Sequence, residues 1–185
     1  MLHSGRGELA TVTGASLVRP HAAVRDDPYR LSIGLIGVEA VLRLFPEQEQ
    51  NERVFAAVTR FLDRLDEVEP GSRRPELDPL GLAFQLKLLW LAGYLPHTDG
   101  CAACGEEGPI VGFSPRTGGV VCSRCAAGSV AISPDGLVAI DALLHRPLAD
   151  AATAGLTDRA ARDVLALVTS SYEFHGGFRL RTVTV

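Results

Sequence analysis

All four cysteines of this 185-residue chain lie in two Cys-x-x-Cys pairs. The first pair is Cys101 and Cys104, the second is Cys122 and Cys125, and residues 105–121 separate them. Four thiolates that arrive as two such pairs can close a tetrahedron around one Zn²⁺ ion. The spacing therefore predicts a structural zinc site, because four protein ligands leave no open position for catalysis.

Glycines and valines around the two pairs predict the local fold. Gly105 follows Cys104, where a residue without a Cβ lets the chain turn away from the metal. Gly118-Gly119 predicts the turn of a short hairpin, and Val120-Val121 would be the strand that leads into the second pair. Residues 101–125 are therefore interpreted as a zinc ribbon.

Other uses of the thiols stay open. Two disulfides would also account for four cysteines, but the N-terminus has no signal-peptide pattern, so reduced thiols in the cytoplasm are expected. A redox switch is a further alternative, in which oxidation of the thiolates releases the metal. His97 lies four residues before Cys101 and is expected at the surface or beside the site, since the cysteines fill the coordination shell.

Composition and charge limit the classes of function. Hydrophobic residues make up 46% of the chain, which is enough for a packed core, and no apolar run is long enough to span a bilayer. The formal net charge is −4, so any contact with nucleic acid must come from a local basic patch. Neither a nucleotide-binding loop nor a nucleophile motif is present, and no enzymatic activity is predicted.

Apolar side chains at three- and four-residue steps predict five helices. The third is apolar on almost every side and is expected at the centre of a bundle, with Lys87, its only charge, extending to solvent. Gly34 and Gly37 in the first helix predict close approach of another helix. The predicted helices span residues 28–45, 51–68, 80–95, 133–146 and 157–175.

The two ends of the chain differ from this helical pattern. Residues 8–13 favour a strand that Gly14 ends, and Gly5-Arg6-Gly7 is interpreted as a hairpin turn. Residues 178–183 alternate between apolar and polar, which predicts an extended tail. The predicted fold is a mainly α helical bundle with an inserted four-cysteine zinc ribbon. Four segments are expected: an N-terminal strand region (1–27), the first part of the helical domain (28–98), the zinc-ribbon insertion (99–132), and the second part of the helical domain with the C-terminal tail (133–185).

Three stretches carry a family resemblance. Residues 82–96 read LAFQLKLLWLAGYLP and lead directly into the first cysteine pair. Phe113-Ser114-Pro115 precedes the second pair, and the tail reads HGGFRLR over residues 175–181. In this combination the chain, over roughly residues 5–185, resembles the RecO family of recombination mediators and DNA repair proteins.

The resemblance implies a role in the RecF recombination pathway. Members of that family bind single- and double-stranded DNA and anneal complementary strands. With RecR they help to load the recombinase onto DNA coated by single-strand-binding protein, whose acidic C-terminal tail they contact. The family begins with an OB-fold, of which residues 1–27 would be a remnant. A cytoplasmic, nucleoid-associated protein is expected.

Four arginines are candidates for contacts with DNA or with an acidic tail. If they converge, they would form a local basic face, whereas the alternative is that each pairs with a nearby carboxylate. Two other functions are kept as alternatives: an adaptor that binds RecR or single-strand-binding protein without DNA, and a zinc-thiolate redox sensor. The candidate arginines are Arg116, Arg124, Arg179 and Arg181.

Overall fold

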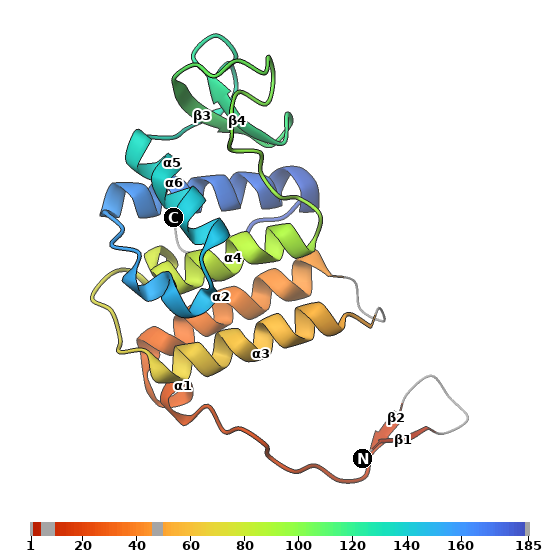
Figure 1. The fold of residues 1–185 in the computed structure, drawn as a ribbon. Coiled ribbons are helices and arrows are strands. Elements are labelled where there is room, and N and C mark those ends of the chain that lie inside the picture. Colours follow the sequence, from red (N-terminus) through yellow and green to blue (C-terminus); the bar gives the residue numbers. More distant parts are fainter. Residues whose placement is uncertain (1, 5–9, 46–49, 184–185) are drawn as a thin grey trace.

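The computed structural model describes residues 2–4, 10–45 and 50–183. A bundle of helices forms the body, and a small β-sheet rises from one end of it (Figure 1). The α-helices are α1 (Ala22–Asp26), α2 (Pro28–Leu44), α3 (Glu52–Glu67), α4 (Pro79–Leu91), α5 (Pro134–His145) and α6 (Asp158–Ser171). Shorter turns are the 3₁₀ segments η1 (Pro75–Leu77) and η2 (Leu148–Thr153) and the π-helical η3 (Tyr172–Gly176).

The predicted helix starts are confirmed, and side-chain caps explain them. Asp27 accepts a hydrogen bond from the backbone N–H of Arg30, and Asp78 accepts from those of Leu80 and Gly81. Ser133 and Thr157 cap α5 and α6 in the same way. Each of these side chains satisfies an amide that the first helical turn leaves without an intrahelical partner.

Helix α4 forms the centre of the bundle, as its apolar sequence predicts. Its side chains are buried on nearly every side, and it contacts α2, α3, α5 and α6. It ends at Leu91, four residues before the predicted end at Leu95. Gly93 adopts a left-handed conformation with φ of 84°, and the N–H of Tyr94 bonds to the carbonyl of Leu89, which closes the helix with a Schellman motif.

Close helix packing at the glycines of α2 is also confirmed. A Cβ atom at Gly37 would lie 2.6 Å from the Phe61 ring of α3 and 3.0 Å from the Phe84 ring of α4. These two rings stack with centroids 4.0 Å apart. Three helices therefore meet where only glycine fits.

The ribbon is inserted between α4 and α5. Strands β3 (Ile110–Ser114), β4 (Gly119–Cys122) and β5 (Val130–Ala131) form an antiparallel sheet in the order β4-β3-β5. The predicted hairpin turn is confirmed, with Gly118 at φ of 74°. Phe113 and Ile132 are buried in the core of the helical body, so the ribbon is packed onto the bundle.

The N-terminal segment stands apart from the body in Figure 1. Strands β1 (Leu2–Ser4) and β2 (Ala10–Val12) pair antiparallel, with Leu2 opposite Val12. Residues 11–20 are exposed. The strand predicted over 8–13 is confirmed for its described part, whereas the predicted turn at 5–7 lies outside the described residues. A single strand pair does not establish an OB-fold remnant.

Residues 178–183, which follow η3, are neither helix nor strand, and their burial alternates as predicted as far as Arg181. Phe178 and Leu180 are buried, and Arg179 and Arg181 are exposed. The segment boundaries at residues 28, 99 and 133 remain predictions. None of the helices that the structure describes is both long and apolar enough to cross a bilayer.

Candidate metal centre

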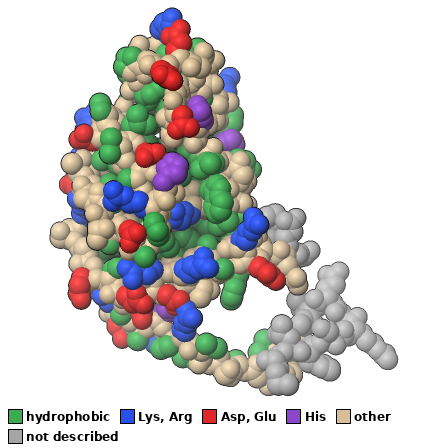
Figure 2. Space-filling view, viewed as in Figure 1, with side chains coloured by type: hydrophobic (Ala, Val, Ile, Leu, Met, Phe, Trp, Pro, Cys, Tyr) green, Lys and Arg blue, Asp and Glu red, His purple; other side chains and the backbone are tan. Residues whose placement is uncertain are grey.

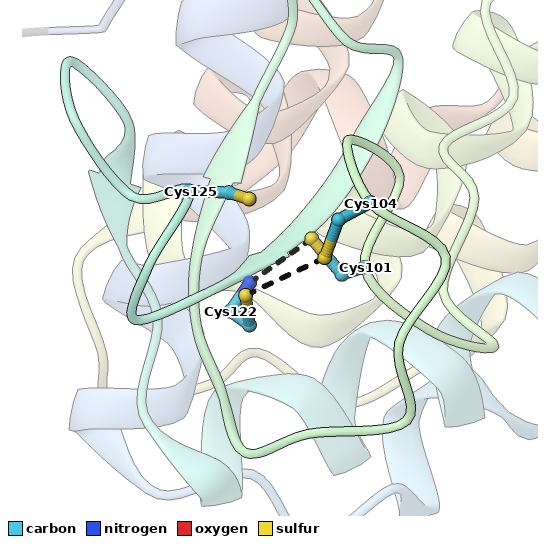
Figure 3. A group of neighbouring side chains, drawn as sticks. All are labelled: Cys101, Cys104, Cys122 and Cys125. Carbon is cyan, nitrogen blue, oxygen red and sulfur yellow. Dashed lines mark hydrogen bonds between the residues drawn. The ribbon is translucent and has the colours of Figure 1, made fainter.

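The four cysteines converge within the ribbon. Cys101 and Cys104 come from the loop after α4, whereas Cys122 ends β4 and Cys125 lies in the turn that follows it. Figure 3 shows the two loops facing each other with the sulfurs directed to a shared space. The four Sγ atoms all lie within 4.8 Å of one another.

This geometry fits one tetrahedral metal ion. With Zn–S bonds of about 2.3 Å, the sulfurs of a regular tetrahedron lie about 3.8 Å apart. The Sγ atoms of Cys104 and Cys122 are 3.9 Å apart. The backbone N–H of Cys122 donates to Sγ of Cys101 at 3.4 Å, a bond that favours the thiolate form. The chemistry of the donors, four thiols, suits a thiolate-binding ion such as Zn²⁺.

The protonation of the cluster also favours a cation. The hydrogen bond from the Cys122 N–H is the main reason that the pKa of Cys101 falls to about 6. The pKa of Cys125 instead rises to about 12, first because its thiol hydrogen-bonds to Cys104 and second because of burial. The pKa values of these two thiols therefore shift in opposite directions within one cluster. A dication would be needed to keep all four sulfurs ionised.

Arg124 lies at this centre, between the two cysteines of the second pair in sequence. Its guanidinium forms an ion pair with Glu106, which raises the arginine's pKa, and contacts with the sulfurs of Cys122 and Cys104 raise it further. The charge of Arg124 is therefore directed partly toward a site whose four thiolates and one dication would carry a net negative charge.

The other candidate arginines occupy separate places. Arg179 forms an ion pair with Glu173, with a 2.8 Å contact between Nε and Oε1. Arg116 lies exposed in the β3–β4 turn, and Arg181 lies exposed on the tail. Neither guanidinium forms an ion pair with a carboxylate of residues 10–45 or 50–183. Two of the four arginines thus follow the paired alternative, and their role in binding stays a prediction.

A groove on the helical body was not predicted from the sequence. Its cavity of about 860 Å³ lies between α3, α4 and the start of η2. Phe84, Trp90, Leu91 and Leu148 supply apolar surface. Charged side chains of α3 and α4 also line it: the basic residues Arg53, Arg60, Arg64 and Lys87, and the acidic residues Glu52 and Asp63. Figure 2 shows hydrophobic side chains over the helical body with Lys and Arg around them, and Asp and Glu interspersed.

Lys87 is held in this groove by a helix end. Its Nζ donates to the carbonyls of Leu144 at 3.2 Å and Arg146 at 2.9 Å, at the C-terminus of α5, and burial lowers its pKa. Both carbonyls lie where a helix carries partial negative charge. The sequence predicted a side chain that extends to solvent, because it gave no sign that α5 ends beside α4.

Comparison with known proteins identifies the family. Residues 25–183 match the family model described as "Recombination protein O C terminal". The chain is 34% identical over 171 residues to DNA repair protein RecO of Rubrobacter xylanophilus, covering 89% of this chain and 66% of that protein. It is 32% identical over 180 residues to DNA repair protein RecO of Anaeromyxobacter sp. strain K, with 94% and 68% covered.

A third relative, DNA repair protein RecO of Frankia casuarinae, is 35% identical over 152 residues, with 81% of this chain and 57% of that protein covered. The chain spans about two thirds of the length of the first two relatives. The family match includes the helical body and the cysteine cluster. The chain therefore belongs to the RecO family of DNA repair proteins.

Proposed function

We propose that this chain acts in DNA repair as a mediator of the RecF recombination pathway. In this role it binds single- and double-stranded DNA, promotes annealing, and with RecR helps to load the recombinase in the cytoplasm, at the nucleoid. The carrying observation is the family match, which extends over residues 25–183 and covers helices, ribbon and tail together. This activity handles DNA strands and requires no catalytic residue.

The cysteine centre would support this role through structure. Cys101, Cys104, Cys122 and Cys125 would hold one Zn²⁺, and the metal would crosslink the two loops that carry them. The ribbon's own cluster of buried residues is small, comprising Cys101, Val121 and Cys122. A metal crosslink is the usual means by which so small a core is stabilised.

Fluorescence anisotropy of a labelled single-stranded oligonucleotide over a salt series tests the DNA-binding proposal. Binding that weakens steeply with salt is expected, because arginines would replace counterions on the phosphates. Arg181→Gln should reduce the magnitude of the slope by about 1 if that side chain contacts a phosphate. Arg74→Gln is the control, since Arg74 is already paired with Glu76. An absence of binding at low salt would contradict DNA binding by this chain.

The groove favours a second candidate, an adaptor that binds the acidic tail of single-strand-binding protein. An apolar floor beneath basic side chains suits a peptide that carries both hydrophobic and acidic residues. Arg53 and Arg60 form no ion pair with any carboxylate in the described part of the chain. Their charges are therefore available to a ligand that lies against Trp90.

Trp90 provides a direct readout because it is the only tryptophan in the chain, and it is 55% exposed. Titration with an acidic-tail peptide should change its fluorescence, and a peptide with its acidic residues replaced by amides should not. Arg60→Ala should weaken binding, whereas Arg159→Ala, on α6 outside the groove, should not. Equal responses to both peptides would contradict this candidate.

The redox-sensor hypothesis is tested at the metal centre alone. Peroxide should release zinc reversibly if the exposed thiol of Cys104 and its neighbours act as a trigger. Zinc that stays bound under peroxide would contradict a sensing role, and would leave both of the preceding candidates unaffected.

A further inference from the structure

The segment that precedes α1, residues 11–21, contacts the groove of α3 and α4 at one carboxylate, and we call this segment the arm. Arg19 forms an ion pair with Asp63, and Nε2 of His21 lies 3.9 Å from Oδ1 of the same carboxylate. Asp63 lines the groove, whereas none of the arm's residues does. The arm is therefore joined to the groove through Asp63.

Helix α1 fixes the course of the arm. The backbone N–H of Val24 donates to Oδ1 of Asp66 at 3.0 Å, and the Val24 side chain is buried. Asp66 thus satisfies an amide in the first turn of α1, which His21 leaves without a side-chain cap. His21 itself adopts φ of 43°, which is uncommon for a residue other than glycine, and turns the chain where the arm leaves the body (Figure 1). Asp63 and Asp66, three residues apart on α3, therefore hold the arm and α1 against the same helix.

Arg60 is the natural competitor of Arg19 for Asp63. Oppositely charged side chains three residues apart on a helix lie close enough to pair. Arg60 and Asp63 have this spacing on α3, and both line the groove. In the described part of the chain, however, Asp63 pairs with Arg19 and His21, and Arg60 pairs with no carboxylate. The contact with the arm thus coincides with a free guanidinium in the groove.

Two of the four basic side chains of the groove are already engaged. Arg64 is held by an ion pair within α3 and donates to the carbonyl of Ala149 at 3.0 Å. Lys87 donates to two carbonyls at the end of α5. Arg53 and Arg60 remain, so a pairing of Arg60 with Asp63 would leave an anionic ligand one free guanidinium of two.

We propose that Arg19 is a specificity-determining residue of the groove: it holds Asp63 away from Arg60 and so keeps the Arg60 guanidinium free for an anionic ligand. That this ligand is an acidic peptide rests on the adaptor function proposed above. Without Arg19, Asp63 would turn toward Arg60, and its charge would repel the acidic groups of the peptide. Because coupling between two sites is reciprocal, a bound acidic peptide should in turn strengthen the contact between the arm and α3.

Quenching of Trp90 fluorescence by iodide tests the proposal without a peptide. Trp90 lines the groove, is 55% exposed and is the only tryptophan of the chain, and iodide, as an anion, reports the charge around it. At constant ionic strength, Arg19→Gln should lower the quenching constant about twofold, because the charge of Asp63 then acts on the groove. Quenching by uncharged acrylamide should not change. Arg25→Gln is the matched control, since it removes the same charge from an exposed residue of α1 that does not line the groove, and it should leave both constants unchanged.

A second series, with Asp63→Asn, separates the effect of Asp63 from the charge of Arg19 itself. Titration with the acidic-tail peptide should show that Arg19→Gln weakens binding about threefold, whereas Asp63→Asn binds at least as tightly as the wild type. Adding Arg19→Gln to Asp63→Asn should change neither peptide binding nor iodide quenching, because Arg60 then has no competing carboxylate. An equal loss from Arg19→Gln in both backgrounds would overturn the proposal, since Arg19 would then act by its own charge.

The two measurements distinguish failure of this proposal from failure of the adaptor function. If the wild type binds no acidic peptide but iodide quenching depends on Arg19 and Asp63 as expected, the adaptor function fails and the role of Arg19 stands. If the peptide binds and iodide quenching is the same in the wild type and Arg19→Gln, the adaptor function stands and the role of Arg19 is overturned.

Discussion

The hydroxyl of Tyr172 donates a hydrogen bond to Oε1 of Gln85, which joins the end of α6 to α4 inside the helical core. Tyr172 is 1% exposed and Gln85 is 3% exposed. The Nε2 atom of Gln85 has no hydrogen-bond partner among the residues of known placement. This pair is therefore a polar contact in an otherwise apolar core, and its two members depend on each other.

Tyr172→Phe should destabilise the protein by about 1–3 kcal/mol, because it leaves both polar atoms of the Gln85 side chain buried without a partner. Urea denaturation, followed by circular dichroism, measures the change. Adding Gln85→Leu to this variant should recover part of the loss, since both partners are then apolar. Equal stability of the wild type and Tyr172→Phe would show that the hydrogen bond contributes nothing.

Gly37→Ala should be strongly destabilising. The new Cβ would lie 2.6 Å from the Phe61 ring and 3.0 Å from that of Phe84, and neither ring can move without disturbing the stacked pair. Overpacking of this kind costs about 1–3 kcal/mol. A thermal or urea unfolding curve measures it.

Gly34→Ala is the matched control on the same helix. Its Cβ would make ordinary contacts of 3.5 Å with Leu65 and Val24, and alanine favours a helix over glycine by about 1 kcal/mol. This variant should be as stable as the wild type or more stable. A similar loss in both variants would contradict the packing explanation.

The local structure was largely predictable because each helix carries its own start signal. Asp27-Pro28 and Asp78-Pro79 place a capping carboxylate before a proline in the first turn, and both mark the observed starts. The cysteine cluster was also predictable from local sequence, because the spacing of two Cys-x-x-Cys pairs is typical of four ligands around one metal ion. Gly93 also signalled the end of α4, although the predicted helix ran on to Leu95.

Contacts between distant segments were not predictable. Glu39 meets Arg181, Lys87 meets the end of α5, and Gln85 meets Tyr172 only because of how the helices pack. In the sequence, Arg53 and Arg60 belong to the polar face of one helix, and Trp90 belongs to the apolar pattern of another. Only the packing of α3 against α4 brings the three side chains to one groove. Periodicity identifies which face of a helix is buried, but it does not identify the neighbour.

Cys122→Ser should abolish stoichiometric zinc and unfold the ribbon. Zinc binding contributes about 10–16 kcal/mol to the folding of zinc-finger peptides, and the ribbon's own core is small. Metal analysis together with a thermal scan measures both effects. Ser123→Ala, at the exposed neighbouring position, should retain zinc and melting temperature. Full zinc occupancy in Cys122→Ser would contradict a four-cysteine site.

Glu39 should make the stability of the protein depend on pH. Burial raises the pKa of this carboxyl, but hydrogen bonds from Arg181 and Thr182 outweigh burial and hold the pKa below its usual 4.5. The stability from Glu39 is therefore fully present above pH 4.5 and is lost as the pH falls through the lower, folded-state value. Glu39→Gln should cost about 1–3 kcal/mol at pH 7, and the difference from the wild type should shrink below pH 4.5. Urea titrations from pH 7 to pH 3 measure this difference in stability.

The control is Glu173→Gln, which removes only an exposed partner of Arg179. It should change stability by less than about 0.5 kcal/mol throughout this pH range. A constant difference between Glu39→Gln and the wild type across this range would mean that the charge of Glu39 does not hold Arg181 and Thr182 in place.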